Sequence, residues 1–162
     1  MNPWRPSHRF DVAALPLADR HYNRRAVGSP QFVPPGRNLV FLTSGAGALW
    51  VTSWPFEEYV RHAWPGAWVN SLFRRETGPI ASELIAWAVA ATRAEWEPPA
   101  LGIVSFIDPT KTRRKRDPGR CYRKAGWKHV GFTKGGLWVY QQLPADMPAP
   151  DYSVKAPLLV NG

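Results

Sequence analysis

Residues 80–107 read IASELIAWAVAATRAEWEPPALGIVSFI, and this stretch indicates how the chain folds. Apolar residues recur at helical spacing from Ile80 to Ala91, which predicts a helix that ends near Trp96. The two prolines that follow stop it, and the continuous apolar run of residues 101–107 is typical of a strand buried in the centre of a sheet. A long helix followed by a buried strand predicts an α/β or α+β domain.

Further strands are predicted on both sides of this stretch. Upstream, residues 38–44 and 48–53 form a hairpin, and the alternation in residues 68–74 predicts a third strand. Downstream, residues 120–125 suit a short helix, and residues 130–142 form a last hairpin around two glycines. We therefore expect a single domain in which helices flank a central mixed, mostly antiparallel sheet. In the third strand, one face is expected to carry Trp68, Asn70, Leu72 and Arg74.

The two ends of the chain carry weaker patterns. Residues 1–10 are expected to form an irregular arm, and residues 11–25 predict a short helix that Pro16 interrupts. Residues 144–162 contain four prolines and few periodic positions, which predicts a loosely ordered, Pro-rich tail. The folded domain is therefore expected to cover residues 1–143.

Composition argues against several kinds of protein. One cysteine, Cys121, allows no internal disulfide and fits a reducing cytoplasm. No apolar run approaches the roughly 18 residues that span a bilayer, and no signal peptide is evident. The four histidines show no metal-ligand spacing, so no metal site is predicted, although a metal requirement stays open. We expect a cytoplasmic protein without a membrane partner, located in the host cytoplasm if a phage encodes it.

The formal charge of +9 is concentrated in residues 108–135. This segment holds ten of the 21 Lys and Arg residues, opposed only by Asp108 and Asp117, whereas the rest of the chain is almost neutral. A neutral body with one basic segment is typical of a protein that binds a polyanion, although a solvated loop is the alternative. Such contacts would be salt-dependent and largely independent of sequence. The candidate phosphate-binding residues are Lys111, Arg113, Arg114, Lys115, Arg116 and Arg120.

Residues 121–127 read CYRKAGW and precede the predicted hairpin. The order of a Tyr, three residues, Gly and an aromatic residue resembles an element of the GNAT acyltransferase superfamily. The resemblance implies a GNAT fold in which Tyr122 lies near the sulfur of an acyl-CoA and protonates the leaving thiolate. The alternative for Tyr122 is a core aromatic that packs against Trp127. Positive neighbours would activate Cys121 as a nucleophile, but a small buried residue is the favoured interpretation.

Residues 75–80 read RETGPI and lie between a strand and the long helix. They resemble the GNAT pyrophosphate loop, Arg/Gln-x-x-Gly-x-Gly/Ala, although Ile80 stands at the last position and Pro79 lacks an N–H donor. Free N–H groups at a helix N-terminus bind phosphate, and an arginine adds charge, whereas an ordinary helix start is the alternative. The resemblance implies acetyl-CoA or another acyl-CoA as the donor. Its candidate binding residues are Arg74, Arg75, Gly78 and Ser82.

The element order over residues 11–142 also matches GNAT topology, and within that superfamily the chain is similar to phage Mom-type DNA-modification proteins. The likeness lies in His21-Tyr22, in Asp108-Pro109, and in the spacing of Gly119 from Tyr122. It implies that Asp108, His21 and Tyr22 act at the site, with Asp108 orienting or deprotonating an amine. A turn-capping role is the alternative for Asp108, and a surface or packing role for the other two.

Together these patterns predict a phage-type, acyl-CoA-dependent N-acyltransferase-like enzyme that modifies the exocyclic amine of a base in duplex DNA. The basic loop, residues 111–120, would hold phosphates, and the base would leave the stack, where Trp50 or Trp54 would stack on it. One alternative is a GNAT enzyme that acts on a small amine, a peptide or a protein. Another is a non-catalytic nucleic-acid-binding protein on a GNAT scaffold.

Overall fold

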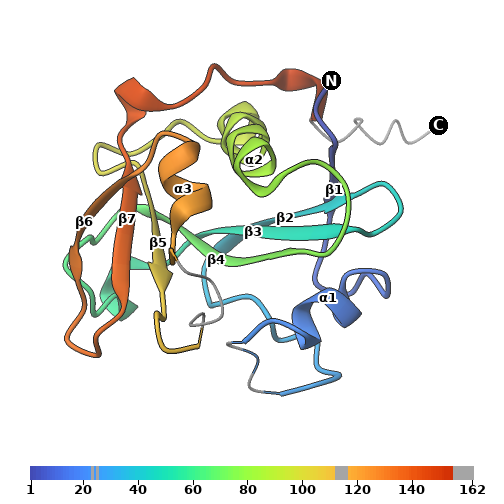
Figure 1. The fold of residues 1–162 in the computed structure, drawn as a ribbon, viewed down its shortest axis with the longest axis horizontal. Helices are drawn as coiled ribbons and strands as arrows, with labels where there is room; N and C mark the ends of the chain where they lie inside the picture. Colours follow the sequence, from blue (N-terminus) through green and yellow to red (C-terminus); the bar gives the residue numbers. More distant parts are fainter. Residues whose placement is uncertain (23, 25, 112–116, 155–162) are drawn as a thin grey trace.

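The computed structural model describes residues 1–22, 24, 26–111 and 117–154. Within these residues, seven strands form one sheet in the order β1-β2-β3-β4-β5-β7-β6 (Figure 1). All neighbouring strands are antiparallel except β4 and β5, which are parallel. The strands are β1 (Trp4–Ser7), β2 (Arg37–Thr43), β3 (Ala48–Trp54), β4 (Trp68–Arg75), β5 (Ile103–Ile107), β6 (Lys128–Phe132) and β7 (Trp138–Gln142). The expected α/β class and the mixed, mostly antiparallel sheet are confirmed.

Helices cover both faces of the sheet (Figure 1). The helices α2 (Ala81–Glu95) and α3 (Arg120–Lys124) pack on one face, and α1 (Leu15–Asp19) packs on the other. Three short 3₁₀ turns complete the described elements: η1 (Glu57–Tyr59), η2 (Pro144–Asp146) and η3 (Tyr152–Val154).

The larger core lies between α2 and the sheet. Leu84 and Ala88, two residues of the expected apolar face, are fully buried there together with Ile85 and Val89, and all four share a cluster with Trp68 of β4. Ile80, which the spacing placed on the same face, is 56% exposed because it precedes the helix as its N-cap. Burying a large apolar side chain contributes about 1.5–3 kcal/mol, so this helix is a main source of stability.

Strand β4 departs from the expected alternation because it contains a bulge. Ser71 is the additional residue in the register between β3 and β4. Trp68 therefore packs in the α2 core, whereas Leu72 packs in the smaller core beneath α1. The expectation that these two residues share one face with Asn70 and Arg74 is wrong, since a bulge reverses the side-chain alternation beyond it.

The N-terminal segment is more ordered than its sequence suggested. Within residues 1–10, strand β1 pairs with β2 at the edge of the sheet, and Trp4 is buried with its indole N–H donating to the Leu84 carbonyl at 2.8 Å. The helix expected within residues 11–25 is limited to the five residues of α1, and Val12 is exposed.

Residues 144–154 pack along α2, where we had expected a loose tail. Met147 and Val154 are buried in the α2 core, and the Asp151 N–H donates to a carbonyl of α2 at 3.0 Å. The remaining part of the expected tail, residues 155–162, lies outside the described residues.

Candidate functional site

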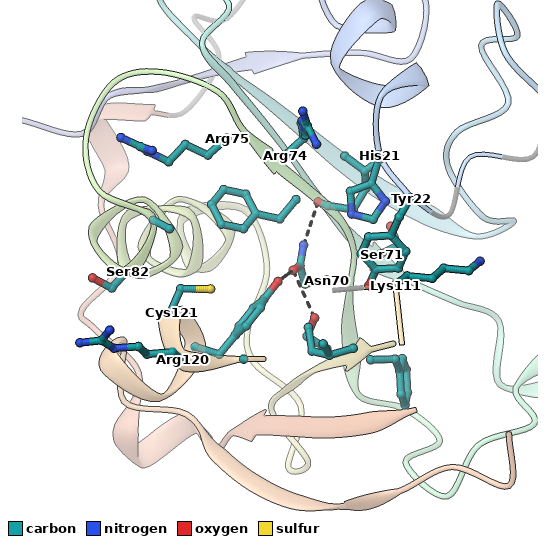
Figure 2. Close-up of a pocket in the computed structure, with 18 of the residues that line it drawn as sticks. His21, Tyr22, Asn70, Ser71, Arg74, Arg75, Ser82, Lys111, Arg120 and Cys121 are labelled. Atoms are coloured by element: carbon teal, nitrogen blue, oxygen red, sulfur yellow. Dashed lines mark hydrogen bonds between the residues drawn. The ribbon is translucent and has the colours of Figure 1, made fainter. Parts of the chain in front are cut away.

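The main candidate site is a cleft where the parallel strands β4 and β5 separate. Their pairing ends at Asn70 and Ser105, although β4 continues to Arg75 and β5 to Ile107. The bulge residue Ser71 follows the last pair directly. A cleft of about 1350 Å³ opens over these strand ends (Figure 2). Strand edges that are not paired with each other can hydrogen-bond to an extended ligand, as they would to a further strand.

Tyr122 lies beneath this cleft, on α3. Its side chain is 5% exposed, and its hydroxyl donates a hydrogen bond of 2.5 Å to Asn70 Oδ1 (Figure 2). Burial raises the pKa of Tyr122 well above its usual range, so the hydroxyl keeps its proton at neutral pH. Its ring also packs on Trp127 and Tyr140, with centroid distances of 4.9 and 6.2 Å. The residue thus fills the core, and Asn70 holds its hydroxyl proton beneath the cleft.

Asn70 orients the Tyr122 hydroxyl, a role that the sequence analysis missed. Its Nδ2 group donates to the carbonyls of Val51 and Leu72 at 3.1 and 2.9 Å, which ties the side chain across the bulge. The Oδ1 atom is left to accept from Tyr122 and, at 3.4 Å, from Ser105. The only sequence signal was an amide directly after two apolar residues in the first half of the strand.

The cleft has a basic lining. Asp117 is the one acidic side chain among the described residues that line it. An excess of positive charge in a concave site favours an anionic ligand. The basic residues that line the cleft are Arg20, Arg74, Arg75, Lys111, Arg120 and Lys124.

The expected pyrophosphate loop lies at one end of the cleft, before α2. Arg75 closes this loop, since its guanidinium donates to the carbonyls of Pro79 and Gly78 at 2.8 and 2.9 Å. Arg75 and Ser82 line the cleft, whereas Gly78 is not among the lining residues and has a φ of 99° that a glycine adopts readily. The structure therefore places Arg75 as a brace of the loop.

The N-terminus of α2 still offers free donors. Ile80 is the N-cap, and the Leu84 N–H donates the first helical hydrogen bond to the Ile80 carbonyl. The N–H groups of Ala81, Ser82 and Glu83 come before that bond, and the first two of these residues line the cleft. The proline in the loop precedes the helix, so the N–H it lacks is not one of these helical donors.

Arg74 lies in a different environment from Arg75. Its Nε donates to Glu76 Oε2 at 3.2 Å, and Arg20 grips the same carboxylate with bonds of 2.5 and 2.6 Å. The hydrogen bond from Arg20 is the largest cause of a lowered Glu76 pKa. Arg20, at the end of α1, was not among the predicted site residues.

Asp108 caps the turn that follows β5. Its Oδ1 accepts from the N–H and hydroxyl of Thr110 at 3.0 and 2.6 Å and from the Lys111 N–H at 3.4 Å. The hydroxyl of Thr110 is the main cause of a lowered Asp108 pKa, which makes this carboxylate a weak base. The geometry favours the turn-capping interpretation, and Asp108 lines a second cavity rather than the main cleft.

The described residues of the expected basic loop, Lys111 and residues 117–120, lie at the cleft, and Arg120 already belongs to α3. Lys111 at one end and Asp117 at the other both line this cleft. Arg123 pairs with Asp117 and donates to the Tyr140 hydroxyl at 2.9 Å, which fixes the second end. Four predicted phosphate-binding residues lie outside the described residues: Arg113, Arg114, Lys115 and Arg116.

His21 and Tyr22 form the wall of the cleft on the α1 side. Their rings stack with centroids 4.4 Å apart (Figure 2), and burial raises the Tyr22 pKa. Cys121, which we expected to be buried, is partly exposed and lines the same cleft. Trp50 is completely buried beneath α2 and cannot stack on a ligand.

A second cavity, of about 1030 Å³, lies on the face of β4 and β5 that is turned away from α2. Its wall includes the rings of His62, Trp64 and Phe106. Burial lowers the His62 pKa, and the His62 Nδ1 atom accepts a hydrogen bond of 3.0 Å from the backbone N–H of Trp64. The two cavities meet at the separated strand ends, because they share lining residues: Tyr22, Asn70, Ser71, Phe106 and Lys111.

The described residues contain no cluster of three or more His, Cys, Asp or Glu side chains that would hold a metal ion. Across the same part of the chain, every helix is too short or too polar to cross a bilayer. A scan against protein-family models, a search of curated proteins and a search of solved structures each found no significant match.

Proposed function

We propose that the chain is an acyl-CoA-dependent, GNAT-like transferase that modifies the amine of a DNA base. The observation that carries this proposal is the basic cleft between the separated ends of β4 and β5, with the protonated Tyr122 hydroxyl beneath it. An acyl-CoA combines a phosphate-bearing end, a thin arm with two amides, and a thioester. The basic lining, the open strand edges and the buried phenol match these three parts in turn.

Different residues of the cleft suit different parts of an acyl-CoA. Ala81, Ser82 and Arg120 line the cleft, so the first N–H groups of α2 and the Arg120 guanidinium suit the pyrophosphate. The edges of β4 and β5 suit the amides of the arm. Tyr122 would pass the proton that it now donates to Asn70 to the thiolate that leaves when the amine takes the acyl group, and the proton lost by that amine would restore the phenol. The raised pKa makes the phenol a weak acid, so this transfer requires the thiolate charge to develop directly beside it.

The second cavity supports a flat aromatic acceptor. The ring of His62 lies 4.9 Å from that of Phe106, and Trp64 packs beside both. Apolar rings around a cavity suit a planar base that has left the duplex stack. Because the two cavities meet at Asn70 and Ser71, donor and acceptor can approach from opposite faces of the sheet.

Charge supports DNA as the carrier of that base. The segment between Lys111 and Asp117 begins and ends at the cleft and contains four further basic residues and one threonine. Backbone phosphates held by such a segment would bring the duplex to the place where the cavities meet. Binding should weaken steeply as salt rises.

A non-catalytic nucleic-acid-binding protein is the second candidate, and specific contacts favour it. In the described part of the two cavities, the carboxylates of Asp108 and Asp117 are already engaged, the first by its turn and the second by Arg123. An amine acceptor would then have to lose its proton to water or to one of the imidazoles that line the cavities, His21 and His62. A GNAT enzyme for a small amine, peptide or protein stays the other alternative.

Mass spectrometry of nucleosides from DNA of expressing cells tests the proposal. We expect a new modified nucleoside with the wild-type protein and none with Tyr122→Phe. Tyr152→Phe is the matched control, because Tyr152 is 66% exposed and lines neither cavity, so it should leave the product unchanged. No new nucleoside together with measurable CoA binding would favour another acceptor. DNA binding with neither product nor CoA binding would favour the non-catalytic alternative.

A further inference from the structure

Three charged side chains from separate elements meet at the α1 rim of the cleft. Arg20 follows α1, Arg74 lies near the end of β4, and Glu76 lies in the loop before α2. Arg20 holds both oxygens of the Glu76 carboxylate, at 2.5 and 2.6 Å, and Arg74 adds a third bond at 3.2 Å. Figure 2 shows Arg74 beside His21, on the side of the cleft away from Ser82.

The carboxylate in this cluster occupies a position that a phosphate would suit. A guanidinium offers a planar fork of N–H donors that binds carboxylate and phosphate oxygens alike. Arg20 and Arg74 line the cleft, whereas Glu76 does not. The side chains of Arg20 and Arg74 are 51% and 39% exposed, and ion pairs at that exposure contribute little to stability. A ligand can therefore displace Glu76 at small cost.

We propose that Arg20 and Arg74 form a phosphate-binding site at the α1 rim and that Glu76 is an internal competitor which the phosphate displaces. The site deepens the proposed function, since it assigns a second phosphate position to the same cleft. Its ligand is a phosphate ester, which either the nucleotide end of a CoA or a DNA backbone can supply.

This site is separate from the loop before α2. Arg75 is committed to the carbonyls of Gly78 and Pro79, and the N–H groups near Ser82 lie across the cleft from Arg74 (Figure 2). Two phosphate positions on opposite sides of one cleft suit a ligand with separated phosphate groups, or two ligands bound together. The net charge of the three-residue cluster is +1, so removing the Glu76 charge doubles the attraction for an anion.

Titration calorimetry at low salt tests the site with three probes: CoA, dephospho-CoA and a 12-base-pair DNA duplex. Glu76→Gln should tighten binding of the probe that uses the site by roughly threefold to fivefold, and Arg20→Gln should weaken it by roughly tenfold. Tightening for CoA but not for dephospho-CoA would identify the 3′-phosphate as the ligand. Tightening for the duplex alone would identify the DNA backbone.

Matched controls separate binding from folding. Glu58→Gln and Arg5→Gln change the same charges at exposed positions that line neither cavity, and neither should alter binding. If the Arg20–Glu76 pair served only to stabilise the fold, both Glu76→Gln and Arg20→Gln would lower stability, and neither would tighten the binding of any probe. That result, or binding of no probe by wild-type and Glu76→Gln protein, would overturn the inference. A duplex effect without any CoA binding would retain the site and refute the acyl-CoA donor.

Discussion

Asn70→Ala tests whether one amide organises the site. Asn70 is 5% exposed, and its side chain joins the bulge of β4 to the Tyr122 hydroxyl. Alanine would leave the Tyr122 hydroxyl and the carbonyls of Val51 and Leu72 without this partner. Each buried group that loses its partner costs about 1–3 kcal/mol, and water from the cleft should recover part of that. We expect the free energy of unfolding to fall by about 3–5 kcal/mol.

Urea denaturation, followed by tryptophan fluorescence, measures this loss. Tyr122→Phe alone should cost only about 1–2 kcal/mol, because it removes one hydroxyl and leaves the rest of the Asn70 network intact. Ser105→Ala is the matched control, since its bond to Asn70 is long, at 3.4 Å, and should cost less than about 1 kcal/mol.

The double variant makes the prediction sharper. In the Asn70→Ala background the Tyr122 hydroxyl is a buried donor without its acceptor, so Tyr122→Phe should be neutral or stabilising there. The two substitutions should therefore be strongly non-additive. Additive losses, or an Asn70→Ala cost below that of Tyr122→Phe, would refute the view that Asn70 holds the phenol in place.

Three further predictions follow from contacts around the site. Acid should remove a small part of the stability below about pH 4, because the folded-state pKa of Glu76 is lowered and the small contribution of its exposed ion pairs disappears as pH falls through that value; Glu76→Gln should remove this small component of a stability–pH curve. Gly119→Ala should lower stability by about 2–4 kcal/mol, because Gly119 has a φ of 80° and an added Cβ would meet the Tyr140 ring; a calorimetric melt like that of wild type would contradict this. Met147→Ala should cost about 2–5 kcal/mol in urea, whereas Leu143→Ala, at a 45% exposed position, should cost little if residues 144–154 belong to the core.

Local periodicity predicted the elements whose apolar face can be recognised from their own residues, without knowledge of the neighbouring elements. Helix α2 follows the expected spacing closely, because one apolar face of 15 residues is visible without any partner. Strand β1 escaped prediction because four residues that include Pro6 give little alternation, and the strand depends on its pairing with β2. The bulge at Ser71 also escaped, since the strand beside it sets the register.

The candidate site was predictable only in part, for a similar reason. Tyr122 and Ser82 could be selected from local motifs, and the structure brings both to one cleft. Arg20 and Glu76 lie 56 positions apart, and no local pattern links them. Asn70 was visible only as one of several polar residues in β4, because its importance depends on a phenol 52 positions away.

The topology explains why positive charge gathers at this cleft. Strands β4 and β5 are the one parallel pair in the described sheet, so their C-terminal ends lie side by side. Strand β4 leads into the N-terminus of α2, which carries partial positive charge, and β5 leads into the basic segment that starts at Lys111. In an antiparallel pair, the N-terminus of α2 and the basic segment would follow opposite ends of the two strands. Ligands of α/β sheets commonly bind at the carboxyl ends of parallel strands, and here the basic segment of a chain that is otherwise nearly neutral starts at that end. The same arrangement attracts phosphate from a CoA or from DNA, which is why the Glu76 variants must be tested against both.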